Sequence, residues 1–262
     1  MSLILHCGSD VISRDDLHNL PVPAPLGKRH VTRPFAEDVE LVAEYLQRNG
    51  FEITSEGYGV KTSKADGTPQ QFFGLLEIRE RALDGEYIPA KPFELQVGIR
   101  GSYDQSLPRG LAVGSRVLVC DNLCFSGEIK VTTKQTLNIA SRIPALLDSA
   151  VGRIPDLASF QVKRFDAYKN FALSQVRGDA ILTNLVRQGI LNPSDLGKAI
   201  AEWDNPSHPE HIADGRSAYT LFQAVTEAYK PPLEGGRPNF HSAWNRGLPL
   251  TEFLDRGVGL TH

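Results

Sequence analysis

The chain has 262 residues, of which 41% are hydrophobic and 23% are charged, and its formal net charge is −3. This length can bury either one large hydrophobic core or two smaller ones. The weakly acidic balance argues against a protein that coats nucleic acid indiscriminately, and no apolar run approaches the roughly 20 residues of a membrane span. The N-terminal stretch "MSLILHCGSDVISRDD" lacks the basic leader and long apolar segment of a secretory signal.

The first predicted segment is irregular. Residues 1–33 contain the proline-rich run "LPVPAPLGKRH", which favours neither a helix nor a central strand, so we expect an extended strap over the fold. A helix is predicted next. Pro34 suits its first turn, apolar residues then recur at helical spacing, and Gly50 follows as a stop signal.

The apolar pattern then changes from helical to alternating, which is typical of β-strands. The predicted strands cover residues 51–60, with a bend at Gly57 and Gly59, and residues 70–80, 93–103, 116–120 and 128–136. The pair Asp66-Gly67 predicts a tight turn, because glycine readily adopts a positive φ. Residues 34–140 are therefore expected to form one helix and a mostly antiparallel sheet.

From about residue 140 the pattern is helical. Segments such as "DLASFQVKRFDAYKNF" and "GRSAYTLFQAVTEAYK" are separated by Gly, Pro and Asn. The predicted fold class is α+β: an N-terminal helix plus a mostly antiparallel β-sheet, followed by a helical C-terminal half. Because no Gly/Ser-rich linker divides the chain, we expect residues 141–262 to pack on the sheet as one body.

The three cysteines are Cys7, Cys120 and Cys124. They are too few for a disulfide framework and indicate reduced thiols in a cytoplasm. Cys120 and Cys124 have a spacing seen in zinc sites, but a structural zinc site needs four ligands and the chain has no second pair. We therefore expect structural thiols, no metal and no cofactor.

The two later cysteines lie in the stretch "RVLVCDNLCFSGEIKV", which we interpret as a shaped corner between strands. Asp121 and Asn122 can form an Asx turn, and Ser126-Gly127 can form a second bend. Phe125 would hold this corner against the core. Local backbone geometry thus accounts for the residues without a ligand.

Residues 96–142 carry six Lys and Arg against three Asp and Glu, a local excess of positive charge. Glycines beside these cations would let a phosphate backbone approach, and a tyrosine could stack on bases. The alternative is that the glycines relieve strain in a bent sheet and the cations are solvated. The candidate nucleic-acid-binding residues are Arg100, Tyr103, Arg109, Arg116, Lys130 and Lys134.

The stretch "GIRGSYDQSLPRGLAVGSRVLVCDNLCFSGEI" resembles the phage and plasmid family catalogued as domain of unknown function 932. The stretches "FFGLLEIR", "AEWDNPSH" and "AYTLFQAVTEAYK" resemble further motifs of that family. The resemblance implies a protein of bacterial mobile elements, in the cytoplasm of a bacterium or a phage-infected host, and implies no agreed activity. The residues that match the family motif are Arg100, Ser102, Asp104, Ser106, Cys120, Asp121, Asn122, Phe125, Ser126, Gly127 and Glu128.

The chain departs from the family pattern at Gln105, where the family commonly has Lys, and at Gln135, where it commonly has His. If those residues serve the family as acid, base or phosphate ligand, this chain lacks them. The departures weaken an enzymatic interpretation more than they weaken a scaffold interpretation.

Three hypotheses about function remain open, and none of them includes a membrane or specifies an oligomeric state. The leading hypothesis is an accessory protein of DNA transactions that binds single-stranded DNA without catalysis of its own. The alternative is an inhibitor of a host defence system that binds a host or phage protein. The third is a metal-dependent phosphodiesterase that uses Asp104, Asp121 and Glu128, if these carboxylates converge on a divalent ion.

Overall fold

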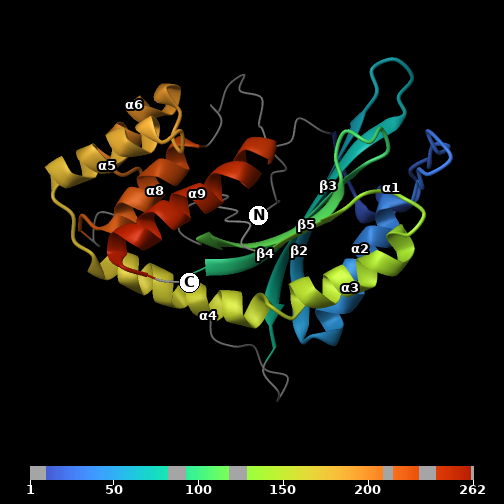
Figure 1. Ribbon diagram of the computed structural model, residues 1–262, viewed down its shortest axis with the longest axis horizontal. Helices are drawn as coiled ribbons and strands as arrows, with labels where there is room; N and C mark the ends of the chain where they lie inside the picture. Colours follow the sequence, from blue (N-terminus) through green and yellow to red (C-terminus); the bar gives the residue numbers. More distant parts are fainter. Residues whose placement is uncertain (1–9, 82–92, 118–128, 209–214, 230–239, 261–262) are drawn as a thin grey trace. The chain divides into compact units, whose positions relative to one another are not determined.

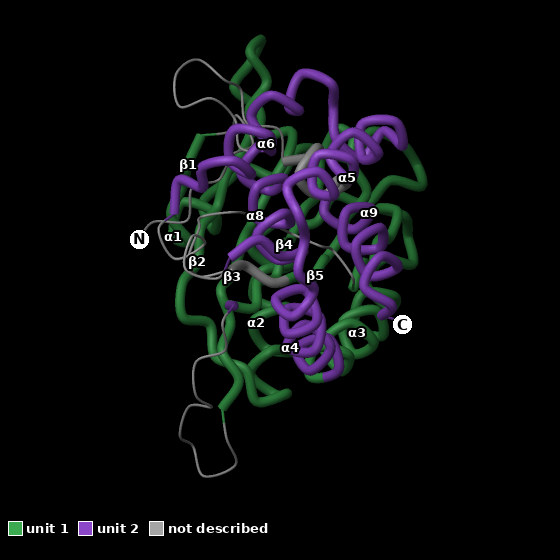
Figure 2. Tube along the Cα trace, turned by 90° about the vertical axis from the view of Figure 1, so that its left-hand side faces the viewer, with its two compact units in different colours: residues 1–90, 94–114, 128–155 green, residues 91–93, 115–127, 156–262 purple. Residues whose placement is uncertain are grey.

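The computed structural model describes residues 10–81, 93–117, 129–208, 215–229 and 240–260. It contains a six-stranded sheet and a helical C-terminal half, which confirms the predicted α+β class (Figure 1). The chain divides into two compact units (Figure 2). Unit 1 comprises residues 1–90, 94–114 and 128–155, and unit 2 comprises residues 91–93, 115–127 and 156–262. The packing of the helical half on the sheet as one body stays a prediction.

The sheet has the strand order β1-β2-β3-β4-β5-β6, so each strand lies beside its neighbours in sequence. The pairs β1–β2, β2–β3, β3–β4 and β5–β6 are antiparallel, as expected when short connections join consecutive strands. The strands span Asp10–Ile12 (β1), Phe51–Thr62 (β2), Pro69–Glu80 (β3), Phe93–Ser102 (β4), Arg109–Val117 (β5) and Ile129–Thr133 (β6).

Three described helices belong to unit 1, and two of them, α2 and α3, contact each other and pack against the sheet (Figure 1). The predicted helix is confirmed as α2, and Gly50 follows it with a φ of +80°. The apolar stripe that predicted this helix is buried and consists of Phe35, Val39, Val42 and Leu46. The helices span Arg14–His18 (α1), Phe35–Arg48 (α2) and Ile139–Val151 (α3).

An aromatic stack anchors α2 to the sheet. The ring of Phe35 stacks on Phe72 of β3, with centroids 5.0 Å apart, and on Tyr103, with centroids 4.0 Å apart. Tyr58 of β2 extends the stack, with its centroid 6.2 Å from that of Phe72. Such pairs contribute about 0.5–1.5 kcal/mol each beyond the burial of their area. Tyr103 therefore belongs to the core of unit 1.

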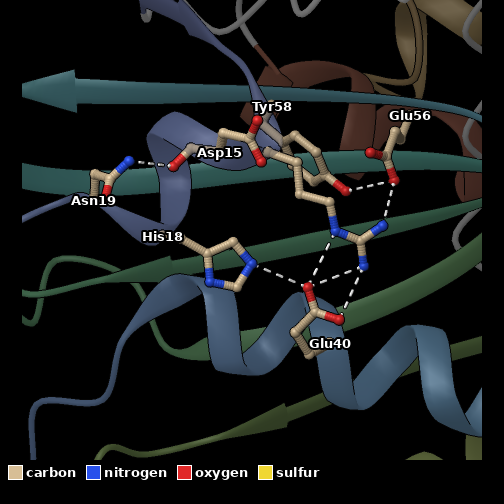
Figure 3. A network of polar contacts seen from close by, with 7 residues as sticks. Asp15, His18, Asn19, Glu40, Glu56 and Tyr58 are labelled. Carbon is tan, nitrogen blue, oxygen red and sulfur yellow. Dashed lines mark hydrogen bonds and ion pairs between the residues drawn. The ribbon is translucent and has the colours of Figure 1, made fainter.

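A polar network attaches α1 to α2 and β2 (Figure 3). Arg14 donates to both carboxylate oxygens of Glu40 at 3.1 Å and to Glu56 at 3.0 Å. His18 contacts Glu40 at 3.1 Å, and the Tyr58 hydroxyl donates to Glu56 at 2.9 Å. Burial alone would raise the pKa of Glu40, but the bonds and charge of Arg14 hold this pKa below its usual value. The predicted N-terminal strap is therefore not wholly extended, because it contains β1 and the anchored helix α1.

Unit 2 is helical, and a buried ion pair joins its first and last described helices. Arg164 of α4 donates to both oxygens of Asp255 of α9 at 2.7–3.1 Å, and these side chains are 0% and 1% exposed. The Tyr168 hydroxyl donates to Asp255 at 2.7 Å. The helices span Ile154–Asn170 (α4), Gln175–Arg187 (α5), Pro193–Asp204 (α6), Ala218–Ala228 (α8) and Phe240–Val258 (α9).

Helix α5 approaches α6 closely at Gly178, where an added Cβ would lie 2.3 Å from Cζ2 of the buried Trp203. Alanine is better than glycine in a helix interior by about 1 kcal/mol, but overpacking a buried site costs about 1–3 kcal/mol. We expect Gly178→Ala to lower the free energy of unfolding by about 1 kcal/mol in urea denaturation. The control Gly197→Ala in α6, where an added Cβ meets nothing within 4 Å, should raise it. An equal rise in the free energy of unfolding in both variants would contradict the close approach of α5 to α6 at Gly178.

Three strands differ from their predicted extents, and one of them is β6, which ends at Thr133, three residues before its predicted end. Strand β2 continues through Gly57 and Gly59, and its pairing with β3 shifts register between Ile53 and Ser55 instead. Strand β5 begins at Arg109, several residues earlier than predicted, because this part of the chain pairs with β6. Such long-range pairing cannot be predicted from the local glycine-rich sequence.

Candidate functional site

Two of the predicted nucleic-acid-binding residues lie in the core of unit 1. Tyr103 and Arg109 are both 3% exposed. Arg109 donates to Asp38 and to the backbone oxygen of Arg33, and its guanidinium carbon lies 5.4 Å from the ring centroid of Phe35. Burial, together with the charge of Arg33, lowers the pKa of Arg109 to about 9, so the guanidinium stays protonated at neutral pH. Neither side chain is placed to meet a ligand on the surface, which corrects the prediction for these two residues.

Arg100 and Lys130 lie on the sheet face opposite to Arg109, as the strand register and the alternation of side chains require. Arg100 is 8% exposed, and burial lowers its pKa. Burial, and then the charge of Arg100, lowers the pKa of Lys130. Lys130 is exposed and Arg100 is not, so of these two candidate nucleic-acid-binding residues only Lys130 is placed to meet a ligand on the surface.

A pocket of about 590 Å³ lies in unit 1 at the end of the sheet where β4 and β6 finish and β5 begins. Its volume falls within the range of about 300–1,000 Å³ that is typical of small-ligand sites. Three segments far apart in the sequence line it, and we call it the strap pocket. The segments are residues 27–30, 105–108 and 134–136.

Backbone contacts hold the predicted strap against the end of β6. The amide of Val31 donates to the carbonyl oxygen of Gln135 at 3.2 Å. His30 and Thr136 form an antiparallel bridge. The strap pocket is therefore closed on one side by residues 27–30, which lie between α1 and α2 in the sequence and far from β6.

The rim of the strap pocket is cationic. Lys28, Arg29 and Lys134 are exposed, and none of the described residues that line the pocket is acidic. Flexible cations of this kind bind phosphate oxygens as charged hydrogen-bond donors. Of the three, the sequence predicted Lys134 alone. The run "GKRH" in the strap was the available signal for Lys28 and Arg29, because it places two adjacent cations beside a glycine.

The inner wall of the strap pocket contains His30 and Gln135, which are 8% and 7% exposed. Nδ1 of His30 accepts from the amide of Leu26 at 3.0 Å, so the ring proton is on Nε2. The side-chain nitrogen of Gln135 donates to the carbonyl oxygen of Ser102. Among the described residues, neither Nε2 of His30 nor Oε1 of Gln135 has a hydrogen-bond partner.

Residues of the predicted motif shape the loop that lines the pocket. Asp104 accepts from the amide of Ser106 at 3.0 Å and from its hydroxyl at 2.5 Å. The hydroxyl of Ser102 donates to the carbonyl oxygen of Leu107 and accepts from its amide, both at 3.0 Å. Between them Gln105 adopts a φ of +61° and is exposed in the strap pocket. These side chains act as turn formers.

The predicted corner between β5 and β6 lies outside the described residues, as does the side chain of Arg116. Among the described residues, no group of three or more His, Cys, Asp or Glu side chains could hold a metal ion. Asp104 has a local role in its turn, and the phosphodiesterase hypothesis stays a prediction. The corner residues concerned are Cys120, Asp121, Asn122, Phe125, Ser126, Gly127 and Glu128, and Cys7 and Cys124 also fall outside the described ranges.

A second pocket in unit 1 lies beside Asp38 and Arg109, between α2, α3 and the sheet. Its volume is about 40 Å³, whereas one water needs about 10–15 Å³. It can hold a few water molecules but no metabolite. The strap pocket is therefore the better candidate for a ligand site in unit 1.

None of the helices in the described part of the chain has both the length and the apolarity of a membrane span. Comparisons with protein-family models, curated proteins and solved structures found no match.

Proposed function

We propose that the protein binds single-stranded DNA, with phosphate groups of the strand held by Lys28, Arg29 and Lys134 at the strap pocket. The observation that carries the proposal is the convergence of these exposed cations on a pocket without an acidic residue in its described lining. Phosphate contacts supply the sequence-independent affinity of such proteins and position the strand. The protein would act as an accessory factor in the DNA transactions of a mobile element, without catalysis of its own.

The concave shape of the site favours a single strand over a duplex. The phosphates of a duplex are fixed on a stiff rod, whereas a single strand can rotate a phosphate into a pocket. The formal net charge of −3 also favours a local site over binding along the whole surface, because the chain as a whole has no excess of positive charge to attract a polyanion.

The resemblance to the phage and plasmid family supports a role in the DNA transactions of a mobile element. Three of the matching residues, Ser102, Asp104 and Ser106, form the turns of the loop that lines the strap pocket. The departures at Gln105 and Gln135 both line the same pocket. A neutral amide stands where the family has a titratable Lys or His, so neither position can transfer a proton in this chain.

The test is the fluorescence anisotropy of a labelled single-stranded oligonucleotide, titrated with the full chain at about 50 mM salt. The test variant carries Lys28→Ala, Arg29→Ala and Lys134→Ala. We expect its association constant to fall at least tenfold, because each lost phosphate contact removes one released counterion. Circular dichroism should stay unchanged, because all three side chains are exposed.

A matched control removes the same number of charges from exposed positions outside the strap pocket. It carries Arg48→Ala, Arg153→Ala and Lys198→Ala. We expect its affinity to stay within about twofold of the wild type, since only long-range and screened charge is lost. An equal loss in both variants would show that net charge, and not the pocket, controls binding.

A further inference from the structure

A pocket of about 530 Å³ lies wholly within unit 2, whose helices are drawn in purple in Figure 2. Its volume falls within the range that is typical of small-ligand sites. Residues of α5, of the segment before α5, and of the last turns of α9 line it, together with the start of α8, and we call it the helical pocket.

Backbone hydrogen bonds fix the segment between α4 and α5, which forms one wall of the helical pocket. The amide of Leu173 donates to the carbonyl oxygen of Arg216 at 3.0 Å. The amide of Ala218 donates to the carbonyl oxygen of Phe171 at 2.9 Å. These bonds flank an antiparallel bridge at the start of α8. The wall is therefore preformed, and a ligand would not have to order it.

Much of the lining of the helical pocket is apolar and reachable from solvent. The apolar side chains that are only partly buried are Phe171, Ile181, Phe253 and Val258. A ligand that covers such surface gains affinity in proportion to the apolar area removed from water. The lining therefore favours a ligand with an apolar body.

Two exposed arginines lie at this apolar surface, Arg177 of α5 and Arg256 of α9. The guanidinium carbon of Arg177 lies 4.9 Å from the ring centroid of Phe171. Among the described residues neither arginine has an ion-pair partner, and Glu252, one turn before Arg256, forms no ion pair with it. None of the described residues that line the helical pocket is acidic. The pocket thus brings two exposed positive charges, from helices far apart in sequence, to one apolar surface.

These two features together select the class of ligand. Inorganic phosphate would leave the apolar surface in water, and a neutral hydrocarbon would make no use of the arginines. A guanidinium presents N–H donors whose spacing matches the two oxygens of a carboxylate. An anion that carries a hydrocarbon chain can use the charges and the apolar surface at the same time.

We infer that the helical pocket binds a small amphipathic anion of the medium-chain carboxylate class. The carboxylate would lie at Arg177 and Arg256, and the hydrocarbon chain against Phe171, Ile181 and Phe253. The inference is independent of DNA binding, because the residues that carry it belong to unit 2 and the strap pocket belongs to unit 1.

The experiment is isothermal titration calorimetry of the full chain with hexanoate, octanoate and decanoate, and with octan-1-ol and octylamine. Each buried methylene strengthens association by about fourfold, so we expect a gain of at least fivefold for each two carbons added. Octanoate should bind at least tenfold more tightly than octan-1-ol, which has no charge, and octylamine should not bind. Equal affinity of octanoate and octan-1-ol, affinity independent of chain length, or no binding of decanoate would overturn the inference.

Two double variants test the role of the arginines. Arg177→Ala combined with Arg256→Ala should weaken octanoate at least tenfold and leave circular dichroism unchanged, because both side chains are exposed. The matched control, Arg187→Ala combined with Lys198→Ala, removes two exposed charges of unit 2 from outside the pocket lining. It should change the affinity by less than about twofold, since only screened charge is lost. An equal loss in both double variants would overturn the inference.

The apolar wall is tested by Ile181→Ser, which replaces a partly exposed side chain of the lining. The gain in affinity from hexanoate to decanoate should become smaller in this variant, because less apolar surface meets the chain. An unchanged gain in a folded Ile181→Ser protein would count against the wall as the binding surface.

Competition with the labelled single-stranded oligonucleotide separates the helical pocket from the strap pocket. The variant without Arg177 and Arg256 should bind the oligonucleotide as the wild type does, and the variant without Lys28, Arg29 and Lys134 should bind octanoate as the wild type does. If the oligonucleotide displaces octanoate from the wild type, the helical pocket belongs to a nucleic-acid-binding surface and the inference is wrong.

Discussion

We expect Asp255→Ala to lower the free energy of unfolding by about 3–5 kcal/mol, because it removes the carboxylate from a buried ion pair and leaves the arginine in its buried position. Arg164 is fully buried and makes three hydrogen bonds to the Asp255 carboxylate. Tyr168 also donates to Asp255 and would lose this acceptor. Urea denaturation followed by circular dichroism measures the change.

Two comparisons separate the buried charge from other effects of the substitution. Asp166→Ala removes an exposed carboxylate from the same helix as Arg164 and should change stability by less than about 0.5 kcal/mol. Arg164→Met combined with Asp255→Leu removes both charges and should recover most of the lost stability. A loss below about 1 kcal/mol in Asp255→Ala would contradict the account of this ion pair.

We expect Asp38→Ala to lower the free energy of unfolding by about 3 kcal/mol, because the buried Arg109 loses its carboxylate partner. The Arg33 carbonyl and the Phe35 ring remain, so part of its environment is kept. The neighbouring substitution Glu37→Ala is the control, since it breaks a partly exposed ion pair with Arg33, leaves the contact between Asp38 and Arg109 in place and should cost less than about 1 kcal/mol.

The difference in free energy of unfolding between Asp38→Ala and the wild type should become smaller as the pH approaches 9. The pKa of Arg109 is lowered to about 9 in the folded wild type, against 12.5 as its ordinary value. Without Asp38 the folded variant releases this proton at a lower pH, while the unfolded chain keeps it. The unfolded state then binds more protons than the folded state, so stability rises with pH. Urea titrations of variant and wild type at pH 7 and pH 9 test the sign, and a difference that grows with pH would contradict it.

Local sequence signals predicted most of the secondary structure. The apolar stripe of α2 is visible at helical spacing, and Gly50 marks its end. The strands and the change to helices near residue 140 also follow from period and propensity. The start of β5 at Arg109 was not predictable in this way, because it depends on pairing with a strand that follows later in the chain.

The candidate site was only partly predictable, because burial is decided by tertiary contacts. Arg109 and Tyr103 look like surface residues in a glycine-rich segment, yet they pack under α2 against Phe35. Lys28 and Arg29 look like part of an irregular strap, yet bridging to the end of β6 brings the strap to the pocket. The sequence analysis grouped the cations of residues 96–142 because they are close in sequence, whereas the fold brings Lys28 and Arg29 beside Lys134.

The most direct test of phosphate binding at the strap pocket is the salt dependence of binding to a single-stranded oligonucleotide. It is measured for the wild type and for the variant in which Lys28, Arg29 and Lys134 are replaced by alanine. Single strands contribute a slope of about −0.7 in log K against log salt for each phosphate contact. Three contacts predict a wild-type slope that is steeper than the variant's by about 2. Equal slopes for the two proteins, or a wild type that does not bind at low salt, would contradict the account.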